Sequence, residues 1–148
     1  MTACEKLVSE LGKILELELK TGSDGTTEIA VEGRLALIKP DADGESVLLY
    51  TIVAMADGSP DPETMKTALA LNLFGLQTVG GHLGIYLDAY IYSRTEPLAD
   101  LTAEDLADRL LAFARVANEI AGKLNSDEPR PQEEAQDVAL PSSEFMRV

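Results

Sequence analysis

The glycine-rich run GGHLG, at residues 80–84, is the stretch of this sequence that comes closest to a phosphate-binding loop. Backbone amides in such a bend can hold an anion. Phosphate loops follow a strand and open a helix, so that the helix N-terminus faces the phosphate. Here the order is reversed, because helical spacing precedes the run and strand-like alternation follows it. No lysine with a serine or threonine completes a Walker pattern there, and we therefore do not expect nucleotide binding.

The chain has one cysteine and one histidine, and the two are far apart in sequence. Neither Cys4 nor His82 has a second histidine or cysteine near it with which to bind a metal ion. The charge of Glu5, next to Cys4, raises the pKa of a thiol, which disfavours a nucleophilic cysteine. We expect Cys4 to be an ordinary small residue at a helix start and His82 to be a structural or surface residue.

Two acidic stretches, SDGTTE at 23–28 and DADGES at 41–46, contain fragments of a calcium-loop pattern. Neither has the full ladder of oxygen ligands with its closing glutamate, and hairpin turns explain both. The sequence has no GxSxG elbow and no cysteine–histidine pair, and it offers no argument for paired carboxylates. We predict no catalytic residue, no cofactor and no metal site, so an enzyme is the weaker class of function.

One small-ligand alternative stays open at this point. His82, Tyr86 and Tyr90 could line a pocket in a small α+β domain. A deep enclosed pocket around these residues would favour ligand binding or catalysis. A flat groove with a large two-fold interface would favour the binding of another polypeptide.

Composition excludes other classes of function. The chain has 148 residues, enough for one domain with a hydrophobic core. A net charge of -14 repels phosphate backbones and anionic lipid, and the absence of tryptophan argues against base stacking. The N-terminus lacks a signal-peptide pattern, and no apolar run approaches the roughly 18 residues of a membrane span. We expect a cytoplasmic protein that neither binds nucleic acid nor inserts into a membrane.

The first part of the chain has the spacing of a helix followed by three strands. Thr2 and Glu5 predict a capped helix over about residues 3–15. The LELELK stretch that ends it changes to a period of two, so the chain leaves the helix in extended form. Alternation around residues 28–32 and 35–39, and the apolar run 47–55, predict three strands in a meander, with the third covered on both faces.

Residues 69–88, LALNLFGLQTVGGHLGIYLD, change from helical to extended spacing across the glycine bend. Ser59 or Asp61 can cap the helix, Pro62 suits its first turn, and Gly75 is its expected end. A broad apolar face is predicted on this helix, at Met65, Leu69, Leu73 and Leu76, widened by Ala68 and Phe74. After the bend, Leu83, Ile85 and Leu87 alternate as in a strand. A turn near Asp88 and Ala89 would make a hairpin.

Thr102 and Asp105 predict the start of a last helix, which ends near Gly122. Its apolar stripe is Leu106, Leu110, Phe113, Ala117 and Ile120. The predicted fold is a single α+β domain over residues 1–124, in the order α-β-β-β-α-β-β-α, with an antiparallel sheet flanked by helices. Residues 125–148 form an acidic, proline-containing tail that is either flexible or docked through its few apolar residues.

Three stretches in this order carry a family resemblance: LVSELGKILELELK near the start, NLFG followed by GGHLGIYLD in the middle, and PLADLTAEDLADRLLAFARVANEIAGKL at the end. Together they resemble the class I type III secretion chaperones of the Tir chaperone (CesT-like) family, from about Glu5 to Leu124. The resemblance implies a cytoplasmic bacterial homodimer. It also implies that the dimer binds the N-terminal chaperone-binding segment of a secreted effector and keeps it competent for export without ATP.

The resemblance implies two apolar surfaces. The dimer interface would comprise Met65, Leu69, Leu73, Leu76, Leu83, Ile85 and Leu87. The effector would contact Leu7, Leu11, Leu15, Ile29, Val31 and Leu37, although these six residues could equally belong to the hydrophobic core. Some proteins of this fold instead regulate transcription by binding another chaperone-like or anti-activator protein. A partner-switching regulator is therefore the nearest alternative.

Overall fold

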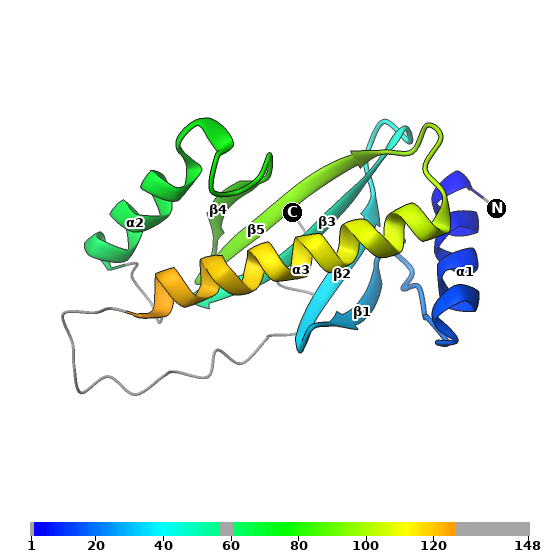
Figure 1. Ribbon diagram of the computed structural model, residues 1–148, viewed down its shortest axis with the longest axis horizontal. Helices are drawn as coiled ribbons and strands as arrows, with labels where there is room; N and C mark the ends of the chain where they lie inside the picture. The colour runs from blue at the N-terminus through cyan, green and yellow to red at the C-terminus, as the bar shows by residue number, and fades with distance from the viewer. Residues whose placement is uncertain (1, 57–60, 127–148) are drawn as a thin grey trace. The chain divides into compact units, whose positions relative to one another are not determined.

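The computed structural model describes residues 2–56 and 61–126 (Figure 1). The elements are α1 (Ala3–Leu15), β1 (Thr27–Val31), β2 (Arg34–Pro40), β3 (Ser46–Met55), α2 (Pro62–Asn72), the 3-10 turn η1 (Leu73–Gly75), β4 (His82–Tyr86), β5 (Ala89–Pro97) and α3 (Ala103–Ser126). The five strands form one antiparallel sheet in the order β1-β2-β3-β5-β4. The predicted α+β fold and the predicted order of elements are confirmed.

The chain divides into two units, which are described separately. The N-terminal unit extends to Tyr50 and includes Arg94–Arg115, so it holds α1, β1 and β2. The central unit comprises Thr51–Ser93 and the residues from Val116 onward, so it holds α2, η1 and β4. The strands β3 and β5 and the helix α3 contribute residues to both units.

In the N-terminal unit, α1 begins and ends where the sequence predicts. The hydroxyl of Thr2 accepts a hydrogen bond from the Glu5 amide at 3.1 Å, and the Glu5 carboxylate accepts one from the Thr2 amide at 2.8 Å. This reciprocal capping box satisfies two amides that the first turn leaves without helical partners. At the other end, Glu16 adopts a left-handed φ of 56° and the amide of Leu17 donates to the carbonyl of Gly12 at 2.9 Å.

The strands β1 and β2 form a tight hairpin in the same unit. Glu32 and Gly33 make the two-residue turn, and both have positive φ, 53° and 74°. Such turns match the twist of the flanking strands. In β1, Thr27 and Ile29 are buried while Glu28 and Ala30 are exposed, as expected for a strand with one covered face. Six consecutive residues of β3 are buried, which confirms a strand covered on both faces.

A buried carboxylate links β5 to α3 in the N-terminal unit. The side chain of Glu96 accepts a hydrogen bond from Arg109 Nη1 through Oε1. Its Oε2 forms an ion pair with Nε of Arg94 at 2.7 Å, but the two groups are not aligned for a hydrogen bond. Glu96 is only 3% exposed, so its charge depends on these two guanidinium groups for compensation.

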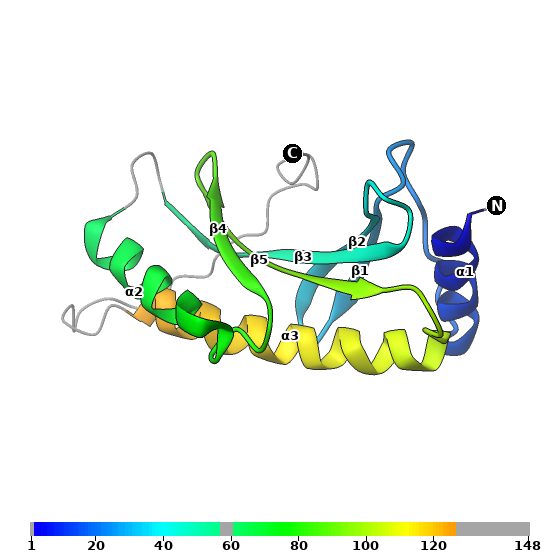
Figure 2. The same cartoon turned by 90° about the horizontal axis from the view of Figure 1, so that it is seen from above.

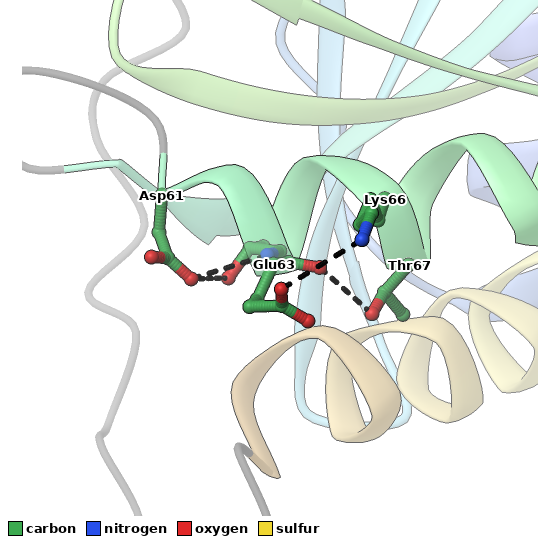
Figure 3. A network of polar contacts seen from close by, with 5 residues as sticks. Asp61, Glu63, Lys66 and Thr67 are labelled. Atoms are coloured by element: carbon green, nitrogen blue, oxygen red, sulfur yellow. Dashed lines mark hydrogen bonds and ion pairs between the residues drawn. The ribbon is translucent and has the colours of Figure 1, made fainter.

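In the central unit, α2 is capped by Asp61. Its carboxylate accepts a hydrogen bond from the Thr64 amide at 3.1 Å, and Pro62 occupies the first turn. Figure 3 shows the Asp61 side chain at the start of the helix. Ser59, the other capping candidate, lies outside the described residues. The expected helix end at Gly75 is wrong, because α2 ends at Asn72 and Phe74 adopts a left-handed φ of 61°. Leu76 consequently lies beyond the helix rather than on its apolar face.

The strands β4 and β5 form the second hairpin, with α2 beside β4 (Figure 2). Its turn is Leu87 and Asp88, one residue before the expected position, and Leu87 has a φ of 55°. Leu87 therefore belongs to the turn and not to the strand. The amide of Ala56, at the end of β3, donates to the carbonyl of Asp88 at 2.6 Å.

The helix α3 starts with the predicted reciprocal hydrogen bonds between Thr102 and Asp105, at 3.1 and 3.2 Å. All five residues of its predicted apolar stripe are buried. The helix continues past the expected end at Gly122 to Ser126. Asn125 holds this last turn, because its side-chain amide donates to the carbonyls of Val53 and Ala121 at 3.1 and 2.7 Å. The rest of the predicted tail, residues 127–148, lies outside the described residues.

Candidate interaction surface

The exposed large apolar side chains are unevenly distributed between the two units. Among the described residues, those of the central unit all lie between Met65 and Leu87, and those of the N-terminal unit all lie between Ile14 and Leu17. We call the first group the central apolar surface: Met65, Leu69, Leu73, Phe74, Leu76, Val79, Ile85 and Leu87. An exposed group of this size is typical of a site for another polypeptide.

The helix α2 turns two of its large apolar side chains, Met65 and Leu69, outward. Ala68 and Leu71 face the interior of the unit and are 8% and 4% exposed. Met65 and Leu69, four residues apart and therefore on one face of the helix, are 38% and 69% exposed. Leu73 in η1 extends this exposed face. The periodicity therefore located an apolar face that the described chain leaves uncovered.

The sequence around the central apolar surface is almost free of charge. From Thr64 to Leu87 the only residue that is charged at neutral pH is Lys66, in a chain in which 26% of residues are charged. With a net charge of -14, two copies of the chain repel each other over most of their surfaces. This stretch lacks that repulsion, and depletion of charge is characteristic of the core of an interface.

The edge of β4 is closed by one side chain. Asn72, the last residue of α2, donates from Nδ2 to the carbonyl of Leu83 at 2.9 Å and accepts at Oδ1 from the Leu83 amide at 2.8 Å. The side-chain amide thus makes the two bonds that a neighbouring strand would make. Because β4 is the outer strand of the sheet, Asn72 limits strand pairing there. The sequence carried no signal for this contact.

The glycine bend is a tight link between α2 and β4, as the sequence predicts. A Cβ atom at Gly81 would lie 2.6 Å from the Ser93 carbonyl oxygen and 2.6 Å from the Tyr92 ring. The carbonyl of Thr78 accepts hydrogen bonds from the Gly81 amide at 2.9 Å and from the Tyr92 hydroxyl at 2.8 Å. Gly80 has a φ of 83°, a conformation that favours glycine.

Three members of the central apolar surface have strained backbones. Phe74, Val79 and Leu87 adopt positive φ values of 61°, 51° and 55°. Bulky and β-branched residues rarely occupy this region, and each such residue costs on the order of 1–3 kcal/mol. The surrounding structure must hold these residues in place, and the strained backbone presents their side chains to solvent. Phe74 and Val79 were not assigned to the dimer interface by the resemblance.

Most of the residues expected to contact an effector are buried. Four of the six are between 0% and 6% exposed: Leu7, Leu11, Ile29 and Leu37. These four belong to the hydrophobic core, which was the alternative given for them above. Leu15 is exposed and Val31 is half-buried. A groove of about 760 Å³ in the N-terminal unit is lined by other residues, from α1 between Glu5 and Glu16 and from the segment between Leu17 and Thr21.

Of the seven residues expected at the dimer interface, six belong to the central apolar surface. Leu83 is the exception, because its side chain is only 8% exposed. In the β4–β5 register Leu83 lies opposite Tyr92. Its side chain therefore shares the buried face of the hairpin with the Tyr92 ring.

The residues of the small-ligand alternative do not come together. Tyr90 lies opposite Ile85 in the β4–β5 register, whereas Tyr86 lies opposite Ala89. Side chains alternate between the faces of a strand, so Tyr90 is on the other face of the hairpin from Tyr86 and His82. Tyr90 is buried and His82 is exposed. The expected pocket is therefore not formed.

Two of the described titratable groups, Cys4 and Tyr90, have a raised pKa. Burial, and then the charge of Glu5, raise the pKa of the Cys4 thiol, as the sequence predicts. Burial, and then the charge of Asp61, raise the pKa of Tyr90, whose hydroxyl has no hydrogen-bond partner among the described residues. Within residues 2–56 and 61–126, no three histidine, cysteine or acidic side chains are grouped so as to hold a metal ion.

The described geometry is one of apolar surfaces and strand edges. The sequence profile of the Tir chaperone protein (CesT) family matches residues 6–121. The chain belongs to this family. The family is one of chaperone proteins. A comparison with curated proteins gives no match. Over its described parts, no helix of this family member is both long enough and apolar enough to span a membrane.

Solved structures share the fold of the family. The Yersinia pestis type III secretion chaperone SycH, in complex with a stable fragment of YscM2, is similar with a TM-score of 0.60 and 16% identity, covering 80% of this chain and 99% of that chain. The HopA1–SchA chaperone–effector complex gives a TM-score of 0.64 and 18% identity, and the ExsC–ExsE complex gives 0.66 and 17%; each covers 80% of this chain and 93% of the other. At these identities the likeness establishes the fold.

Proposed function

We propose that this protein is a type III secretion chaperone that binds the N-terminal segment of a secreted effector in extended form and keeps it competent for export without ATP. The family match over residues 6–121 is the observation that carries the proposal. The similar structures include a chaperone–effector complex and a chaperone bound to a protein fragment, which supports a polypeptide as the partner here. The protein acts in the bacterial cytoplasm and uses no cofactor.

The central apolar surface forms the homodimer interface. Six of its residues belong to the set that the family resemblance implies, and Phe74 and Val79 extend it. Burying apolar area contributes roughly 25 cal/mol per Å², and the surface has almost no charge to desolvate. Because Asn72 occupies the backbone groups of Leu83 on the outer edge of β4, the two copies meet through side chains rather than by extending the sheet at that residue.

The effector segment binds to the N-terminal unit. Leu15 and Val31 remain accessible there from the expected set, and Ile14 and Leu17 add further exposed apolar area. The sheet also ends in this unit at β1, an edge strand. An extended peptide can add to such an edge, where main-chain hydrogen bonds provide affinity for many sequences and side-chain contacts provide selectivity.

A pull-down of the tagged protein from its native cell, analysed by mass spectrometry, tests the function. We expect an exported polypeptide whose N-terminal segment resists protease in the complex, with binding unchanged when ATP is removed. Recovery of metabolites or nucleic acid without any exported polypeptide would refute the chaperone function. A partner-switching regulator would instead retain a cytoplasmic protein that is never exported.

A further inference from the structure

The outer edge of β1 has two residues whose backbone groups point away from the sheet. The two-residue turn at Glu32 and Gly33 pairs Val31 with Arg34. Hydrogen-bonded and non-hydrogen-bonded pairs alternate along an antiparallel ladder, so the amides and carbonyls of Ala30 and Glu28 face outward. Both side chains are exposed. This edge can therefore accept an antiparallel strand.

A segment of the same chain begins to pair with this edge and then leaves it. Thr21 forms an isolated antiparallel bridge with Thr27, and their hydroxyls lie 2.8 Å apart. The Gly22 amide donates to the Thr26 carbonyl at 2.9 Å, which closes the turn between the two segments. Residues 17–20 lie before the bridge and belong to no strand.

The composition of residues 17–20 fits the edge of β1 in the register that the bridge sets. Extending that register places Lys20 opposite Glu28, Leu19 opposite Ile29, Glu18 opposite Ala30, and Leu17 opposite Val31. The two leucines then share the buried face of β1, and the charged residues share its exposed face, with opposite charges at one pair. A shift by one residue would reverse both matches.

In the described structure this segment lies against α1 instead. A Cβ atom at Gly12 would lie 2.9 Å from the Leu17 carbonyl oxygen and 3.6 Å from the Leu19 side chain, so only glycine allows this approach. Leu17 is still 49% exposed there. Residues 17–20 therefore have two alternative surfaces to pack against in the same unit: α1 at Gly12 and the edge of β1.

We propose that residues 17–20 are an internal competitor strand, which exchanges between α1 and the edge of β1 when no partner is bound and is displaced from that edge by a partner strand. This inference rests on the proposed function and specifies the partner. The incoming segment is an antiparallel strand with apolar residues two positions apart, facing Ile29 and Val31, and a basic residue opposite Glu28. Competition reduces the apparent affinity of every incoming segment in proportion to the fraction of time that the edge is free, so a segment must bind the edge more tightly to occupy it at a given concentration.

The substitution Glu18→Pro tests the competitor, with Glu18→Ala as the matched control. Both remove the same exposed charge, but proline also removes the amide that would bond to Ala30. In the full chain without any partner, we expect the Ala30 amide to exchange with solvent about threefold faster in the proline variant than in the alanine variant. A fluorescent peptide of residues 15–21, LELELKT, should bind the proline variant about threefold more tightly than the control. Equal exchange and equal peptide binding would overturn the proposal.

A crosslink gives a second readout that needs no partner. Glu18→Cys combined with Ala30→Cys should form a disulfide under mild oxidation, whereas Glu18→Cys combined with Glu28→Cys, out of register, should react more slowly. Equal rates for the two pairs would also overturn the proposal. The pull-down distinguishes failure of the proposed function from failure of this inference. If the chaperone function is wrong, the pull-down recovers no exported polypeptide with any residue at position 18.

Discussion

Similar apolar patterns are buried in one unit of this molecule and exposed in the other. In the N-terminal unit, Leu7 and Leu11 of α1 are four residues apart and are buried. In the central unit, Met65 and Leu69 of α2 are four residues apart and are exposed. The spacing predicts the same apolar face in both helices, but only in the first does the described chain cover that face. Periodicity therefore locates an apolar face without identifying what covers it.

The flanking charge distinguishes the two cases. The residues around α1 include Glu5, Lys6, Glu10 and Lys13, which keep its outer side in water. The stretch from Thr64 to Leu87 has only Lys66. A helix that meets solvent on one side needs polar residues there, whereas a helix covered on both sides does not. The scarcity of charge around α2 thus indicates a second covering element, which we propose to be the other copy of the chain.

The largest effect is expected from charging one apolar surface at a time. Leu69→Asp should weaken dimerisation by at least about a hundredfold, because it places a carboxylate in a charge-depleted interface, while effector capture per chain should persist. Leu15→Asp, the matched change in the N-terminal unit, should weaken effector capture and leave the dimer intact. Light scattering and the pull-down measure the two outcomes. A Leu69→Asp protein that remains dimeric would contradict the separation of roles.

The next effect concerns the stability of the N-terminal unit. Glu96→Gln should lower the free energy of unfolding by about 3 kcal/mol, because Arg94 and Arg109 lose the buried charge that they pair with. Chemical denaturation measures this loss. As a control, Glu32→Gln removes the carboxylate charge from an exposed pair with Arg115 at 3.6 Å, and should change stability by less than about 1 kcal/mol. Equal losses in the two variants would show that burial of Glu96 is not decisive.

The glycines of the central unit allow a matched comparison. Gly81→Ala should cost on the order of 1–3 kcal/mol and weaken dimerisation, because the new Cβ would clash with the Ser93 carbonyl and the Tyr92 ring. Gly84→Ala should be nearly neutral, because no other atom lies within 4 Å of the Cβ position. Thermal unfolding and light scattering should separate the variants. Unchanged dimerisation in Gly81→Ala would count against the glycine bend as a link in the interface.

The smallest effect concerns Cys4. Its raised pKa means that the thiolate fraction near neutral pH is lower in the folded protein than in the unfolded chain, so iodoacetamide should react more slowly with the folded protein. The folded state keeps the thiol proton to higher pH. The stability contribution is therefore fully present below the unfolded pKa and is lost as pH rises through the folded one. Equal alkylation rates in native and denatured protein would contradict this prediction.

Features governed by neighbouring residues could be predicted from the sequence, and features governed by distant contacts could not. The caps at Thr2, Asp61 and Thr102 depend on residues three positions away; Thr2 and Thr102 are confirmed, and Asp61 is the one of two candidates that caps α2. The predicted end of α2 is wrong because the helical spacing of leucines continues past Phe74. The backbone of Phe74 is left-handed, although phenylalanine does not favour that conformation. The hydrogen bonds of Asn72 to Leu83 connect two elements and leave no local pattern.

The same distinction applies to the candidate sites. Six of the seven residues expected at the dimer interface are exposed, and they lie in a stretch where scarcity of charge and apolar spacing occur together; their role in a dimer stays a prediction. Most of the effector set is in the core, because the spacing of Leu7 and Leu11 is equally suited to packing within one chain. The edge of β1 was not predicted as a site, since which strand lies at the edge of a sheet depends on strand order.

Hydrogen exchange of the native protein, with and without the exported polypeptide recovered in the pull-down, tests the central claim most directly. At micromolar concentration we expect the apolar surface between Met65 and Leu87 to be protected in both samples, because the dimer covers it. The amides of Glu28 and Ala30 should be strongly protected only when the polypeptide is present. New protection that develops between Met65 and Leu87, with none in β1, would contradict the assignment of dimerisation to the central unit and of effector binding to the N-terminal unit.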